Sequence, residues 1–161
     1  MLRRALFLLG IIFLSGCVTT TTYTNSNSEK IQVTEGAKSI QVELAGASSR
    51  EEATNQITNA LAGEGYRIAE SNAQAGVVQT EPREVDGDAI GSVAANVRLN
   101  IVLENSSSAV VEGEYNAPAS TGTDLETSIT FGHSPGSRPA TAWNQMLKAA
   151  EKIGTVTDFK R

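Results

Sequence analysis

The chain has 161 residues and a formal net charge of −5, with 40% hydrophobic and 19% charged residues. This length suits one ordinary domain and excludes large multidomain enzymes and repeat arrays, while the hydrophobic content excludes a fully disordered chain. The negative charge and the 5% aromatic content argue against a nucleic-acid partner, because phosphate binding needs a basic face and base stacking needs aromatic side chains.

The N-terminus has the pattern of a secretory signal peptide. Arg3 and Arg4 precede an uncharged apolar run over residues 5–14. These ten residues would extend about 15 Å as a helix, which is half of the roughly 30 Å hydrocarbon core of a bilayer. The run is therefore too short for a membrane span, and we expect residues 1–16 to be a signal peptide that is cleaved.

The run Leu14-Ser15-Gly16-Cys17 ends this segment and resembles the lipobox of bacterial lipoproteins. The resemblance implies that Cys17 carries a diacylglyceryl group on sulfur, becomes the first mature residue and is acylated on its amine. Two or more chains give stable anchoring where one gives only marginal binding. Residue 18 is not the aspartate that favours the inner membrane, so the resemblance implies the periplasmic side of the outer membrane, in an organism that has one.

The segment after the cysteine is polar. Residues 18–30 read VTTTTYTNSNSEK, with almost no apolar side chains. Threonine suits strands, but a strand here would have little to bury, and the composition is typical of a linker. We therefore expect residues 17–30 to consist of the lipidated cysteine and a flexible tether without a structural role. Since Cys17 is the only cysteine, no intrachain disulfide can form.

The first half of the expected domain contains one helix among strands. Ser49 and Glu52 match a capping box. Apolar residues at helical spacing then predict a helix over 50–62, which the glycines at 63 and 65 end. Period-two alternation predicts strands at 39–44, 66–70 and 76–81, with a weaker strand around 31–33.

The second half contains the expected centre of the sheet. Residues 93–103 form the longest period-two run, with Leu99 and Ile101 on one face and Arg98 on the other. A short turn follows this strand, so the next one must return antiparallel to it. The remaining expected elements are a returning strand at 109–115, a strand at 125–131, a helix at 138–153 and a loose tail after Gly154.

These elements predict an α+β fold for residues 31–161. We expect a single two-layer domain in which both helices pack on one face of an antiparallel meander sheet of five or six strands. This arrangement buries the apolar stripe of each helix against the sheet. Residues 49–84, which include GEGYRIAES and AGVVQTEPRE, resemble helix-grip envelope lipoproteins of the BamC kind. This resemblance implies a helix-grip domain and assigns no binding residues.

The residues of chemical interest do not assemble into a recognisable active site. His133 is the only histidine and lies in a glycine- and proline-rich loop; it lacks the companions that zinc requires, and no G-x-S-x-G elbow supports a catalytic triad. Trp143 has helical spacing with leucine and is expected in the core rather than in a ligand pocket. We therefore expect no enzyme and no catalytic, cofactor-binding or metal-binding residues.

The carboxylates occur in pairs without a matching motif. The pairs are Glu51 with Glu52, Asp86 with Asp88, and Glu112 with Glu114. Glycoside hydrolysis needs two carboxyl groups about 5–10 Å apart across a sugar cleft; the third pair would share one strand face, but aromatic residues for sugar stacking are scarce. The run EVDGDAIG departs from the EF-hand pattern at two positions, so an ordinary acidic loop is expected.

Together these features predict a non-enzymatic lipoprotein that is held by lipid on Cys17 in the cell envelope and binds an envelope protein. The alternative is a carrier of a lipid or small apolar ligand between sheet and helix. An apolar cavity of a few hundred Å³ would favour the carrier. A filled core with an exposed apolar patch or a bare edge strand would favour the binding module.

Overall fold

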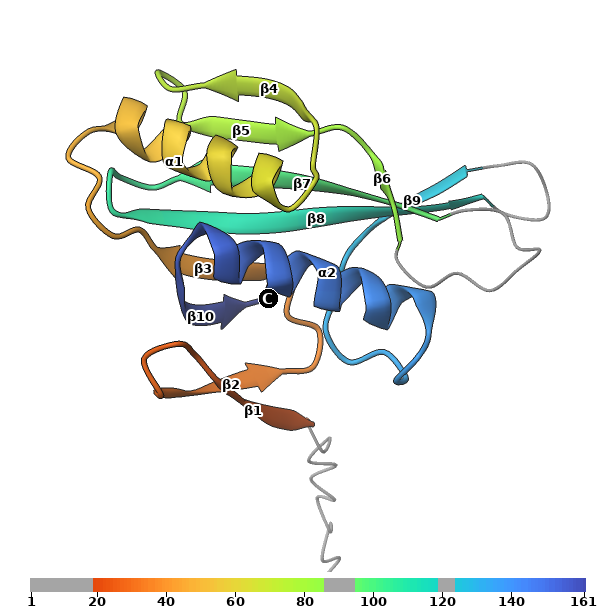
Figure 1. Cartoon of the computed structure of the whole chain (residues 1–161). Coiled ribbons are helices and arrows are strands. Elements are labelled where there is room, and N and C mark those ends of the chain that lie inside the picture. The colour runs from red at the N-terminus through yellow and green to blue at the C-terminus, as the bar shows by residue number, and fades with distance from the viewer. Residues whose placement is uncertain (1–18, 86–94, 119–123) are drawn as a thin grey trace, which may run out of the picture.

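Two helices lie on one face of a large antiparallel sheet, and a separate hairpin lies below it (Figure 1). The computed structural model describes residues 19–85, 95–118 and 124–161. The elements are β1 (Thr20–Thr24), β2 (Lys30–Thr34), β3 (Ser39–Glu43), α1 (Arg50–Gly63), β4 (Ile68–Asn72), β5 (Val77–Thr80), β6 (Arg83–Glu84), β7 (Asn96–Leu103), β8 (Ser108–Pro118), β9 (Asp124–Ser128), α2 (Arg138–Ile153) and β10 (Thr155–Lys160).

The predicted α+β class, with two helices on an antiparallel sheet, is confirmed. The sheet is larger than expected: the described residues form eight strands in the order β10-β3-β8-β7-β5-β4, with β6 paired to β7 and β9 paired to β8. The order follows a meander only from β4 to β9, because β3 and β10 join the far side of β8. The β7–β8 hairpin is thus the centre of the sheet, as its long alternating pattern predicted.

Both helices begin where the sequence indicates. The Ser49 hydroxyl accepts a hydrogen bond from the Glu52 backbone N–H at 3.1 Å, which caps α1. The Glu52 carboxylate accepts from the backbone N–H and the hydroxyl of Ser48, at 2.9 and 2.7 Å, so it reaches one residue further back than a capping box predicts. These hydrogen bonds hold the pKa of Glu52 below its usual range. Ser137 caps α2 in the same way.

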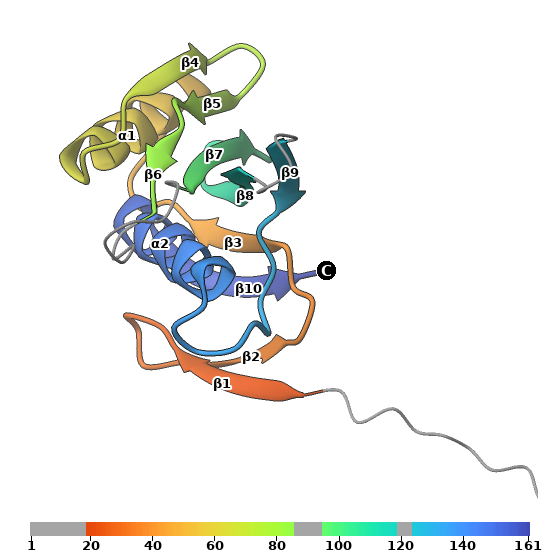
Figure 2. The same ribbon diagram turned by 90° about the vertical axis from the view of Figure 1, so that its right-hand side faces the viewer.

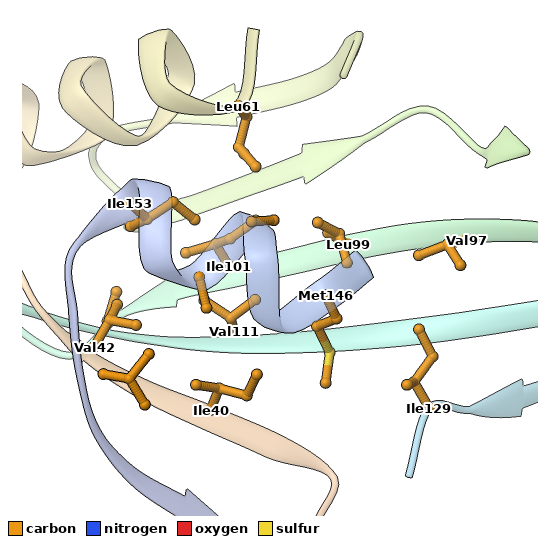
Figure 3. Packing of buried hydrophobic residues seen from close by; sticks show 14 of the residues in the cluster. Ile40, Val42, Leu61, Val97, Leu99, Ile101, Val111, Ile129, Met146 and Ile153 are labelled. Carbon is orange, nitrogen blue, oxygen red and sulfur yellow. The ribbon is translucent and has the colours of Figure 1, made fainter. Parts of the chain in front are cut away.

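The core lies between the helices and the sheet (Figure 3). On β7 the residues Leu99 and Ile101 are fully buried, while Arg98 on the opposite face is partly exposed. α1 covers β4, β5 and β7, and α2 covers β8, β3 and β10. The predicted facing of the central strand is therefore confirmed. The largest fully buried side chains are Ile40, Ile57, Leu61, Leu99, Ile101, Ile129, Met146 and Ile153.

The expected flexible tether is wrong for residues 20–30. Thr20–Thr24 pairs antiparallel with Lys30–Thr34, from Thr20 opposite Thr34 to Thr24 opposite Lys30. This hairpin packs beside β10 (Figure 2). A strand with a single large apolar residue, Tyr23, is held because that ring packs on Phe159 with their centroids 5.4 Å apart. The folded unit therefore begins before residue 31.

The expected loose tail is also wrong, because the last residues form an edge strand. β10 pairs antiparallel with β3, from Thr155 opposite Glu43 to Lys160 opposite Ser39. The chain turns from α2 into β10 at Gly154 without a loop. A Cβ at this position would clash with the backbone oxygen of Glu43, so glycine is what allows the end of α2 to approach β3 closely.

Candidate functional site

The predicted lipid attachment residue, Cys17, lies outside the described residues, as do Asp86 and Asp88. The description begins at Thr19, whose carbonyl accepts a hydrogen bond from the Glu35 N–H at 3.0 Å. β1 begins at the next residue. Any anchor on Cys17 is therefore followed almost at once by folded chain.

Tyr23 joins the N-terminal hairpin to the end of α2. Its hydroxyl donates to the Glu151 carboxylate at 2.7 Å. Burial, followed by this hydrogen bond and the negative charge of Glu151, raises the pKa of Tyr23 well above its usual range. The tyrosine therefore stays protonated and keeps donating throughout the neutral pH range. A groove of about 390 Å³ lies beside this contact and extends to Asn25 and Val156.

Asn25 is a buried polar residue that organises the turn of the hairpin. Its amide group donates to the Val156 carbonyl of β10 and to the Glu29 carboxylate, both at 2.9 Å. Its side-chain oxygen accepts from the backbone N–H groups of Asn27 and Glu29, at 3.0 and 2.9 Å. A single side chain thus shapes the turn and fastens it to the sheet edge.

Replacing Asn25 with alanine is expected to lower the free energy of unfolding by about 1–3 kcal/mol, because it removes the side-chain partners of the buried Val156 carbonyl and of two part-buried backbone N–H groups. Chemical denaturation of the protein measures this. Asn27→Ala is the matched control, because only its backbone N–H takes part, and its effect should stay within about 0.5 kcal/mol. Equal effects of the two substitutions would show that the turn does not depend on the Asn25 side chain.

Four aromatic side chains form a row from the loop before α2 to the N-terminal hairpin. Phe131 lies 5.5 Å from Trp143, Trp143 lies 6.0 Å from Phe159, and Phe159 lies 5.4 Å from Tyr23, measured between ring centroids. Trp143 is 4% exposed, so the expectation that it belongs to the core is confirmed. The row links β1, near the start of the described chain, to three consecutive segments near its end: the loop after β9, α2 and β10.

A hollow of about 190 Å³ lies at one end of this row. It is lined by Phe131, His133, Pro135, Trp143 and neighbouring residues of the loop and α2. His133 is exposed and its Nε2 lies 2.9 Å from the Thr130 hydroxyl. The histidine is therefore a surface residue, as the sequence predicted, and it stands at the rim of the hollow.

The sheet face opposite the helices is polar and acidic. Its exposed carboxylates come from β3, the β7–β8 hairpin and β9: Glu43, Glu104, Glu112, Glu114 and Glu126. Arg98 lies between two of them, with its Nη1 3.5 Å from both the Glu114 and the Glu126 carboxylates. Glu112 and Glu114 point outward as predicted and line a hollow of about 140 Å³ with Lys38 and Asn100. This volume is smaller than the roughly 300–1,000 Å³ of a typical ligand cleft.

Three valines interrupt this polar face. Val77 lies opposite Val102 across β5 and β7, and Val102 lies opposite Val110 across β7 and β8. Val102 is 37% exposed, and the other two are half-buried. Neighbouring positions on adjacent strands lie in direct contact, so the three side chains form a continuous apolar stripe, which we call the valine stripe.

The two edges of the sheet differ. At the β10 edge, the hairpin lies alongside β10, and the Asn25 amide donates a hydrogen bond to the Val156 carbonyl. At the other edge, β5 is the one described strand that pairs with β4, and every residue after Ile68 in β4 is exposed. Unpaired edges expose backbone donors and acceptors to other chains, so β4 is a surface on which another strand can be added.

The two helices are joined by ion pairs at their C-terminal ends. The Glu64 carboxylate lies 3.0 Å from the Lys148 ammonium and 3.6 Å from that of Lys152. The hydrogen bond from Lys148 holds the pKa of Glu64 below its usual range, helped by the positive charges of both lysines. These ion pairs connect the end of α1 to the last turns of α2 at the protein surface.

Within residues 19–85, 95–118 and 124–161, no three His, Cys, Asp or Glu side chains lie close enough together to hold a metal ion. In the same part of the chain, the helices are too short or too polar to cross a bilayer.

No family model matches the chain, and no curated protein matches it. Among solved structures, a TBP-like protein from Parabacteroides distasonis ATCC 8503 is similar over 70% of this chain and 90% of its own. The two share 14% sequence identity and superpose with a TM-score of 0.37.

Proposed function

We propose that the chain is a membrane-anchored bacterial lipoprotein whose domain is a non-enzymatic binding or accessory module in the cell envelope. The observation that carries this proposal is the N-terminal sequence, in which Arg3 and Arg4, the apolar run and the lipobox ending at Cys17 occur together. Lipid on Cys17 places the domain at a membrane, in the periplasm where an outer membrane is present.

The filled core favours a binding module over a lipid carrier. The side chains between helices and sheet form one buried cluster. A carrier needs a cavity of about 300–1,000 Å³ with an apolar lining. The hollow beside Trp143 has a volume of about 190 Å³ and lies at the end of the helix layer, while the groove of about 390 Å³ lies outside the core, beside the hairpin. Neither of these spaces separates the sheet from the helices.

The surface of the sheet supplies the features that protein binding needs. The valine stripe is apolar and surrounded by carboxylates and amides, in the manner of an interface centre with a polar rim. The bare β4 edge offers main-chain hydrogen bonds to an added strand. The valine stripe lies on the sheet face opposite the helices, and the β4 edge lies at the side of the sheet opposite the hairpin. An envelope protein can therefore reach either surface while the domain stays anchored.

The anchor is tested by Cys17→Ser, which removes the only thiol. We expect this variant to remain as an uncleaved precursor or to appear in the soluble fraction, and we expect mass spectrometry of the unchanged protein to find diacylglyceryl on Cys17. Fractionation and mass measurement of both proteins decide this. A fully processed serine variant that stays in the membrane would contradict the proposal.

The binding surface is tested by photocrosslinking in native membranes. A photoreactive amino acid at Val102, in the valine stripe, or at Asn72, on the β4 edge, is expected to give a discrete crosslinked product with an envelope protein. The same group at Asn55, an exposed position on α1, is the matched control. Equal products from all three positions, or none from the first two, would contradict binding through the sheet.

A further inference from the structure

The short distance between the anchor and the fold restricts how the domain can lie on its membrane. Thr19 is two residues after Cys17, and two residues span at most about 7 Å even when fully extended. Thr19 is itself fixed, because its carbonyl accepts from the Glu35 N–H at 3.0 Å and the next residue pairs with Thr34. The lipid attachment point therefore lies within a few ångströms of a defined place on the domain.

That place includes the loop before α2. The Gly36 N–H donates to the Phe131 carbonyl at 2.9 Å, and the Phe131 N–H donates to the Ala37 carbonyl at 2.9 Å. Gly132 lies against the side chain of Glu35, with no room for a Cβ between them. The start of β1, the turn after β2 and the loop after β9 thus form one continuous end of the molecule.

We propose that this end, consisting of Thr19–Thr20, Glu35–Gly36 and Gly132–Gly136, rests on the surface of the bilayer. We call it the anchor-side surface. The inference rests on the proposed lipid anchor and adds to it an orientation and a membrane-contacting surface. Its partner is the headgroup layer of the membrane that holds the anchor.

The chemistry of the anchor-side surface suits this position. Its residues are mostly small and uncharged, and Glu35 is the one member with a formal charge at neutral pH. The carboxylates of Glu43, Glu104, Glu112, Glu114 and Glu126 lie on the outer sheet face instead. Since negative charge is repelled by anionic lipids, the nearly neutral end is the one that approaches the headgroups at the lowest cost.

This orientation places the β4 edge far from the bilayer. The hairpin lies at one end of the molecule and β4 at the other (Figure 1). Between β10 and β4 the sheet order contains four further strands, and five spacings of about 4.8 Å amount to about 24 Å. The strand that is free to pair therefore points into the periplasm, towards partners that are not embedded in the same membrane.

Trp143 gives a direct measurement, because it is the only tryptophan of the chain and lines the hollow next to the anchor-side surface. The full lipidated protein is purified from membranes and reconstituted into phosphatidylcholine vesicles that contain a headgroup spin label, a short-range quencher of tryptophan fluorescence. We expect strong loss of Trp143 fluorescence in these vesicles compared with vesicles without the label.

Two variants make this measurement specific. A Gly-Ser insertion of about twenty residues between Val18 and Thr19 has a mean span of roughly 25 Å; it keeps the anchor and is expected to abolish the quenching. The double variant Trp143→Phe with Glu70→Trp moves the probe to exposed β4 and is expected to show no quenching. Circular dichroism of each variant confirms that it is folded.

The outcomes separate the two proposals. Quenching that is unchanged by the insertion, or that is as strong from position 70 as from Trp143, would overturn the orientation although the protein remains anchored. Absence of quenching in a protein that carries lipid and binds vesicles would overturn it as well. A purified protein with no lipid on Cys17 by mass spectrometry would overturn the proposed anchor, and the orientation with it.

Discussion

Replacing Trp143 with alanine is expected to lower the free energy of unfolding by about 3–5 kcal/mol, the usual cost of truncating a buried tryptophan. Trp143 is 4% exposed and packs between Phe131 and Phe159. Its removal leaves a cavity at the centre of the aromatic row. Phe159, which packs on Tyr23 of the hairpin, also loses its contact with the Trp143 ring. We therefore expect the N-terminal hairpin to loosen together with the end of α2.

Chemical denaturation measures this effect, and hydrogen exchange of the β1 and β2 amides reports on the hairpin. Trp143→Phe is the matched control, because a smaller ring keeps part of the contact with both neighbours, and its cost should be clearly lower. If alanine and phenylalanine were equally mild, the aromatic row would not be what holds the hairpin. If only α2 lost protection, the hairpin would depend on the Asn25 hydrogen bonds instead.

Replacing Ile101 with alanine is expected to cost about 2–5 kcal/mol. Ile101 is fully buried at the centre of β7, opposite Val111 of β8 and Val78 of β5. The substitution would leave a cavity in the core between the sheet and the helices (Figure 3). The central strands cannot move inward to fill this cavity without breaking their pairing. The loss is a large part of a typical total stability of about 5–15 kcal/mol.

The adjacent residue provides the control for this measurement. Val102→Ala removes an aliphatic side chain from the same strand, but on the outer face, where Val102 is 37% exposed. We expect its cost to be below about 1 kcal/mol, since little buried surface is lost. Denaturation curves of the two variants side by side give the comparison. Similar costs at both positions would mean that another chain covers the valine stripe in solution.

The central sheet and both helices could be predicted because one physical signal defines them. On β7, buried apolar residues alternate with polar residues from Asn96 to Ile101, so Leu99 and Ile101 indicate both the strand and the face that it buries. α1 and α2 add capping residues, Ser49 and Ser137, to a helical apolar period. In these elements local propensity, pattern and packing agree, and a single sequence is sufficient to place them.

The two terminal strands could not be predicted because they break or lack that pattern. In β10 a bulge between Val156 and Asp158 places two consecutive residues outward, so the buried Val156 and Phe159 are three apart instead of two. In β1 the decisive groups are Tyr23 and Asn25, which act through one aromatic contact and a set of hydrogen bonds. Hydropathy gives little weight to either.

The candidate surfaces were only partly visible in the sequence for a related reason. The valines at 77, 102 and 110 come from three strands, and only the register between those strands brings them together. The bare β4 edge depends on strand order, which no local pattern contains. Cys17 is the opposite case, because its signal lies entirely in consecutive residues.

The position of β10 has a consequence for the order in which this protein can fold. β10 is the outer neighbour of β3, and its Val156 carbonyl accepts a hydrogen bond from Asn25, which lies 131 residues earlier in the chain. During synthesis, β3 and the hairpin leave the ribosome early, whereas their pairing partner β10 is the last strand to be made. Pairings across such long stretches form slowly, and until then β3 remains an open edge that neighbouring chains can occupy. A polypeptide released before Thr155 would keep that edge permanently, so premature termination even this close to the end should yield an aggregating product rather than a slightly shortened one.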